Sequence, residues 1–108
     1  MAYFLMTCLH HEDPAQAREV LRPRHRAWVG SGGEGRVSVL IGSALTDAAG
    51  ASIGNFAILE APDSATARAF AEGDPFARAG LVSSIEITPL PPGFQAHRIA
   101  EPMSPRLG

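Results

Sequence analysis

The stretch RVSVLIGSALTDAAGASIGNFAILEA (residues 36–61) lies at the centre of the chain and decides its fold. Apolar residues alternate with small or polar ones over 36–44 and again over 52–61, and this period of two predicts two β-strands. Small residues at 46–50 predict a short loop that pairs the strands as an antiparallel hairpin. In the first strand we expect one face to carry Val37, Val39 and Ile41, and the other to carry Ser38, Leu40 and Gly42.

A helix is predicted on the N-terminal side of this hairpin. Asp13, Pro14 and Gln16 have the residue types of a helix start, with Asp as N-cap and Pro at the first helical position. Proline disfavours the helical conformation in the residue before it, so we expect Pro23 to end this piece at a bend and to begin a second one. The two pieces form apolar faces from Ala17, Val20 and Leu21 and from Ala27, Trp28 and Val29, and glycines at 30–35 end the second.

A second helix is predicted on the C-terminal side of the hairpin. Asp63 caps it, Gly73 ends it, and its apolar face carries Ala67, Phe70 and Ala71. The sequence Asp74-Pro75-Phe76 then has the pattern of a further N-cap with proline at the first helical position. We expect one more short turn there, before the chain enters its last strand.

The outermost segments, 2–9 and 81–90, are both predicted strands. The resulting βαββαβ order predicts an α+β fold of the ferredoxin-like type, an antiparallel sheet with both helices on one face. The strands are apolar on both faces while helices cover only one, so we expect a homodimer that covers the other. In the first strand, one face is expected to carry Phe4, Met6 and Cys8, and the other Tyr3, Leu5, Thr7 and Leu9.

Length and composition limit the function classes. The 108 residues suit one domain, 1–90, followed by a tail, 91–108, that is rich in Pro and Gly. We expect the tail to form an arm to about Ile99 and to lose order beyond it, so that residues 101–108 are dispensable for folding. The net charge of −2 gives no support for nucleic-acid binding. The first apolar run is too short for a signal peptide or a membrane span, which favours a cytoplasmic protein.

The stretch Arg22-Pro23-Arg24-His25-Arg26-Ala27-Trp28 is the richest in functional groups. Histidine changes its charge near neutral pH, so a histidine held in a helix can act as an acid or a base. In a ferredoxin-like fold the two helices lie side by side and antiparallel, which brings His25 and Asp74 to the same end of the domain. A solvated basic turn at His25 and a plain helix cap at Asp74 are the alternatives.

The pattern Arg22-Pro23-x-His25, a glycine-containing middle strand and Asp74-Pro75-Phe76 resembles the YCII-related family of small bacterial proteins. The similarity runs from residue 2 to about 90. It implies a dimeric α+β barrel domain, akin to muconolactone isomerases, in which His25 and Asp74 form the catalytic pair. The chain departs from the family after Gly42, where Ser43 and Ala44 replace a frequent proline.

The predicted chemistry is proton transfer without a cofactor, by which a lyase or isomerase acts on a small organic acid, lactone or phenol. An ionised Asp74 would fix the tautomer of His25 and make its other nitrogen more basic. Arg22 and Arg24 are candidates for binding a carboxylate or phenolate, and Ser43 is a further candidate substrate-binding residue. A non-catalytic dimeric module that binds a small ligand is the alternative. A metal site at the pair would lack the three protein ligands that are usual for catalytic zinc.

Overall fold

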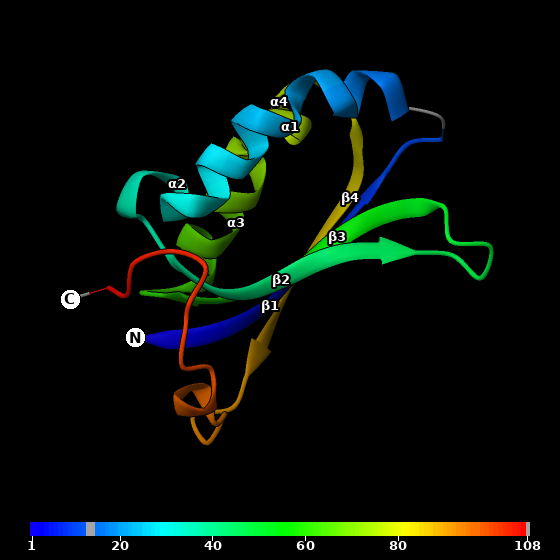
Figure 1. Cartoon of the computed structure of the whole chain (residues 1–108). Coiled ribbons are helices and arrows are strands. Elements are labelled where there is room, and N and C mark those ends of the chain that lie inside the picture. Colours follow the sequence, from blue (N-terminus) through cyan, green and yellow to red (C-terminus); the bar gives the residue numbers. More distant parts are fainter. Residues whose placement is uncertain (13–14, 108) are drawn as a thin grey trace.

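The computed structural model describes residues 1–12 and 15–107, so the predicted cap at Asp13 and Pro14 lies outside the described residues. The predicted βαββαβ order and ferredoxin-like α+β fold are confirmed, with a four-stranded antiparallel sheet in the order β2-β3-β1-β4. Figure 1 shows the helices gathered over one face of this sheet. The elements are β1 (Ala2–His10), α1 (Ala15–Gly30), α2 (Gly32–Gly35), β2 (Ser38–Thr46), β3 (Ser52–Ala61), α3 (Ser64–Gly73), α4 (Pro75–Arg78), β4 (Val82–Leu90) and the 3₁₀ turn η1 (Ala96–Arg98).

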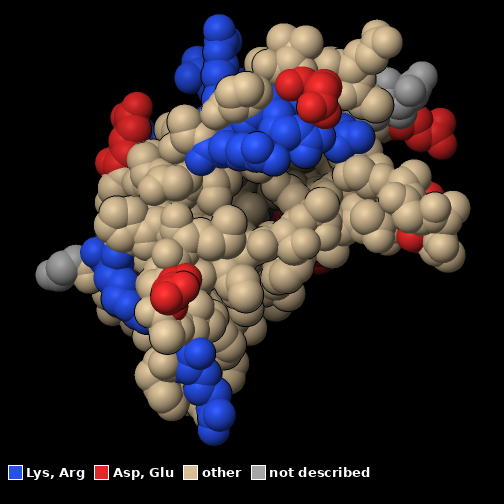
Figure 2. All heavy atoms as spheres, in the orientation of Figure 1, with Lys and Arg blue, Asp and Glu red and all other residues tan. Residues whose placement is uncertain are grey.

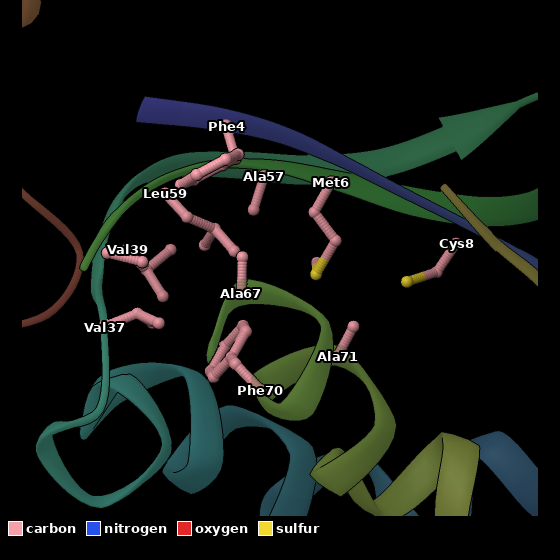
Figure 3. Packing of buried hydrophobic residues seen from close by; sticks show 11 residues of the cluster. Phe4, Met6, Cys8, Val37, Val39, Ala57, Leu59, Ala67, Phe70 and Ala71 are labelled. Carbon is pink, nitrogen blue, oxygen red and sulfur yellow. The ribbon is translucent and has the colours of Figure 1, made fainter. Parts of the chain in front are cut away.

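The core lies between the sheet and α3. The expected alternation in β1 is confirmed, because Phe4, Met6 and Cys8 are buried while the residues between them are not. Figure 3 shows these three side chains pointing from the sheet towards the helices. From α3, the predicted apolar face meets them and is almost completely buried: Ala67, Phe70 and Ala71.

The predicted caps of α3 and α4 are both present. Asp63 accepts a hydrogen bond from Thr66 N at 2.8 Å and from the Thr66 hydroxyl at 2.7 Å, and these bonds lower the pKa of the Asp63 carboxyl. Asp74 accepts one from Phe76 N at 2.8 Å. Each cap therefore satisfies a backbone N–H that has no partner within its own helix.

Strand β2 differs from its expected alternation. Val39 pairs with Leu59 but Ile41 pairs with Ile58, so Leu40 is an extra residue in β2. Because one extra residue reverses the faces of all that follow, Ile41 does not share a face with Val39 as predicted. It is instead 45% exposed.

Helix α1 is continuous through Pro23, so the predicted bend and second helix start are wrong. Proline removes one helical N–H, which would have bonded to the carbonyl of Glu19. Pro23 is exposed, and water can bond to that carbonyl instead. His25 therefore lies in the middle of a long helix and not in an opening turn.

Trp28, which packs against the core together with Val29, attaches helix α1 to the rest of the protein. The Trp28 Nε1 donates a hydrogen bond to the carbonyl of Phe70 at 3.0 Å, and the two rings stack with centroids 5.8 Å apart. Gly33 and Gly73 leave room for this indole, since a Cβ at Gly73 would lie 2.7 Å from it. The other half of α1 is different: Val20, which we expected on an apolar face, is 79% exposed.

The tail folds back on its own chain. Phe94 packs on Tyr3 with ring centroids 5.5 Å apart, and the chain then turns round β2 towards the helices, as Figure 1 shows in orange and red. Ser104 is 4% exposed, and its Oγ accepts a hydrogen bond from Val39 N at 2.7 Å. The expected loss of order after Ile99 is therefore wrong. None of the helices in the described part of the chain is long and apolar enough to span a membrane.

Candidate active site

A cavity of about 530 Å³ lies under α1, on the helix-covered face of the sheet. Its apolar lining includes Met6 and Cys8 of β1 and Phe70 and Ala71 of α3. Figure 2 shows a hollow in the surface, with a band of basic side chains directly above it. Helix α1 has no buried residue. It covers the cavity and does not pack directly on the sheet.

The side chains of His25 and Asp74 meet at this cavity. His25 Nδ1 lies 2.6 Å from Asp74 Oδ2, with the two side chains 17% and 14% exposed. Both residues line the cavity. A carboxylate only accepts hydrogen bonds, so Nδ1 carries the proton that is shared with Asp74. In the neutral ring, Nε2 is then the acceptor, and no described residue forms a hydrogen bond with it.

Asp74 serves two roles through two different oxygens. Oδ1 accepts the hydrogen bond from Phe76 N that caps α4, while Oδ2 faces His25. The Phe76 ring stacks on the imidazole with centroids 4.3 Å apart and planes 14° apart. The helix cap fixes the carboxylate, and the stack and the hydrogen bond together fix the plane of the His25 ring.

Cys8 lies at the same cavity and remains a thiol. Burial, with a smaller contribution from the negative charge of Asp74, raises the pKa of Cys8 from 9.0 to about 12. Since the thiolate is the reactive form, Cys8 is an apolar lining residue at neutral pH. A buried free cysteine commonly behaves as a small hydrophobe.

The structure brings together most of the candidate residues but not all of them. His25, Asp74, Arg22 and Ser43 all line the cavity. The Ser43 hydroxyl donates to the neighbouring carbonyl of Ala44 at 3.0 Å. Arg24 is exposed and is not among the described residues that line the cavity. A residue two positions after Arg22 points to a different side of a helix.

Sequence reasoning missed Arg18 and Arg26, which also line the cavity. They lie four residues before and four residues after Arg22, a spacing that puts all three on one helix face. The signal was present in the sequence, but the expected break at Pro23 divided the helix between them. With two separate pieces, no common face was predicted.

The fold and this pair define a class: a ferredoxin-like α+β domain with a His–Asp contact in a cavity between helix and sheet. The model of the YCII-related domain family matches residues 2–91. The chain belongs to this family, and the resemblance inferred from its motifs is confirmed. Residues 92–107 of the tail lie outside the match.

The chain is also similar to a solved structure, that of 5-chloro-2-hydroxyhydroquinone dehydrochlorinase (TftG) from Burkholderia phenoliruptrix AC1100 in complex with 2,5-dihydroxybenzoquinone. The TM-score is 0.72 at 23% sequence identity, and the match covers 84% of this chain and 95% of that one. At this identity the similarity supports the fold. No protein among the curated sequences matches the chain.

Proposed function

We propose that the protein is a lyase or isomerase that moves a proton on a small hydroxylated ring, lactone or organic acid, with His25 as the base and Asp74 as its orienting partner. The observation that carries this proposal is the contact of 2.6 Å between His25 Nδ1 and Asp74 Oδ2 at the lining of a cavity. A similar fold in a dehydrochlorinase that was solved with a hydroxylated quinone supports the type of ligand.

The reaction needs only a base and a place for the ligand. His25 Nε2 takes a proton from a C–H or O–H bond, and the electron pair of that bond forms a new double bond. In an elimination, the leaving group departs with its own bonding pair, and the imidazolium releases the proton to it or to water. In an isomerisation, the imidazolium returns the proton to another carbon. A general base positioned in this way contributes about 10²–10⁴-fold to the rate.

The test is turnover of a panel of halogenated hydroquinones and lactones, followed by chloride release and chromatography. We expect His25→Ala to lower kcat at least 100-fold. Asp74→Asn keeps an oxygen for the cap of α4, because Asn is as good an N-cap as Asp, but it removes the negative charge, and we expect it to lower kcat as well. His11→Ala is the control, since His11 is exposed and not in the cavity lining.

Two outcomes would contradict this function. Unchanged turnover in a folded His25→Ala variant would show that His25 is not the base. Binding of these compounds by the wild type without any conversion would identify a ligand-binding module.

We also propose that two copies of the chain stack through the sheet face that the helices leave open. Ile41, which lies on the opposite face from the buried Val39, is 45% exposed, and burying such apolar surface favours association. Sedimentation at micromolar concentration tests this, and a folded monomer of 11.4 kDa would contradict it.

A further inference from the structure

Three arginines stand in a row on the face of α1 that looks into the cavity. Arg18, Arg22 and Arg26 recur every four residues and all line the cavity, whereas Arg24, which is out of phase with them, is not among the described residues that line it. Figure 2 shows a band of basic side chains above the hollow. Among the described residues that line the cavity, Asp74 is the only carboxylate, and His25 already contacts it. The lining therefore has an excess of positive charge.

Two of these guanidinium groups have hydrogen-bond donors to spare. Arg18 Nη1 donates to Ser52 Oγ at 3.1 Å, and Arg22 Nη2 donates to Glu19 at 3.0 Å. The Nε atoms of Arg18 and Arg22 are both buried and have no hydrogen-bond partner in the described part of the chain. A buried donor without an acceptor is costly, so an acceptor that enters the cavity would be bound favourably.

The bond to Glu19 leaves Arg22 available to a ligand. The side chains of Arg22 and Glu19 are 40% and 70% exposed, and such exposed pairs contribute little to stability. A guanidinium presents Nε and Nη donors as a planar fork that matches the two oxygens of a carboxylate. A carboxylate is thus the group that best fits the free donors.

The helix also sets the size of the ligand. An α-helix rises about 1.5 Å per residue, so His25 lies about 4.5 Å further along the axis than Arg22 and about 10.5 Å further than Arg18. If the carboxylate of an acid binds at these arginines, the far side of a ring attached to it lies next to His25. The cavity lining beneath includes the apolar side chains of Met6 and Phe70, which suit the ring itself.

We propose that the ligand of this cavity is a monocyclic organic acid. Its carboxylate binds Arg18 and Arg22, the positive charge of Arg26 adds to the attraction, and its ring lies beside His25. The proposal rests on the proposed function for what happens to the ring. The binding itself depends on the arginine row and not on proton transfer by His25.

Calorimetry with two matched probes tests the proposal: 2,5-dihydroxybenzoate, which carries a carboxylate, and hydroquinone, which does not. We expect the wild type to bind the acid at least tenfold more tightly, with an affinity that falls as salt is added. Arg22→Gln and Arg18→Gln should each remove about tenfold of this preference. Arg24→Gln is the matched control, because it removes the same charge from the exposed side of the same helix, and it should bind like the wild type.

The possible results separate this proposal from the proposed function. Equal binding of the two probes, or an equal loss in Arg24→Gln and Arg22→Gln, would overturn the arginine site. Displacement of the acid by an equal concentration of inorganic phosphate would overturn the assignment of a ring acid. If wild type and His25→Ala both bind the acid tightly and neither converts any acid, the function fails and the ligand class stands. If hydroquinones are converted without preference for acids, the ligand class fails and the function stands.

Discussion

Helices α1 and α3 cover the same face of one sheet, yet they are attached to it in different ways. Helix α3 buries Ala67, Phe70 and Ala71 against the strands, whereas α1 has no buried residue and stands over a cavity. Trp28 joins the two helices by its hydrogen bond to the carbonyl of Phe70. Helix α3 therefore contributes to the core, whereas α1 carries functional side chains and is held in place by its contact with α3.

The difference explains why His25 and the three arginines that line the cavity all come from α1. A helix that packs directly on a sheet must present apolar side chains to it, which leaves no room for charged groups. A helix held away from the sheet can turn basic side chains inward, because the cavity gives them space for water or a ligand. The contact between His25 and Asp74 then connects α1 to the C-terminal end of α3.

The largest expected effect comes from a matched pair of substitutions, one on each helix. Phe70→Ala removes a buried ring that is 1% exposed, and we expect it to lower the free energy of unfolding by about 3–5 kcal/mol. Val20→Ala on α1 should change it by less than about 0.5 kcal/mol, because Val20 is 79% exposed. Urea unfolding measures both, and similar losses would show that α1 is attached as firmly as α3.

A smaller loss of stability is expected from the contact between the tail and β2, next to the cavity. Ser104→Ala leaves the buried N–H of Val39 without its acceptor, at a cost of about 1–3 kcal/mol. Thermal unfolding of this variant, with Ser83→Ala at an exposed serine as control, measures the loss. Equal stability of the two variants would favour the expectation from the sequence that residues 101–108 are dispensable for folding.

The smallest expected effect is a loss of stability at high pH that comes from the Cys8 thiol. It tests whether water is excluded from the cavity lining at Cys8 as it is from the core under α3. The pKa of Cys8 is raised from 9.0 to about 12, so the folded state disfavours the thiolate. The stability from this neutral thiol is fully present below pH 9 and is lost between pH 9 and 12. By pH 10 the loss is roughly 1 kcal/mol. Urea unfolding at pH 8 and pH 10 should show a smaller decrease in Cys8→Ala, and an equal decrease would place water against the thiol.

Features that depend on neighbouring residues could be predicted from the sequence. The caps at Asp63 and Asp74 and the alternation in β1 follow from local hydrogen bonds and from the period of a strand. The family motif indicated the pair of His25 and Asp74. The helix ends predicted from the element order led to the same two residues, although that prediction assumed a helix start at Pro23 that the structure does not have.

Features that depend on distant contacts could not be predicted. Helix α1 continues through Pro23 to Trp28, whose hydrogen-bond partner Phe70 lies 42 residues away. The order of the tail depends on Ser104 and Val39, which are 65 residues apart. The extra residue at Leu40 has no mark in an otherwise regular apolar pattern, so the reversed face of Ile41 could only be seen in the pairing with β3.

The turn of the tail round β2 also limits how copies of this chain can associate. Strand β2 is at one edge of the sheet, and edge strands offer free backbone groups to which strands of other molecules add, often without limit. At Val39 these groups are occupied by the tail, whose Met103 and Ser104 N–H groups donate to the Val39 carbonyl at 2.9 and 3.1 Å. On the opposite edge, Pro89 of β4 has no N–H to offer. The tail at Val39 and the proline at position 89 therefore each interrupt the row of free backbone groups to which another strand could add.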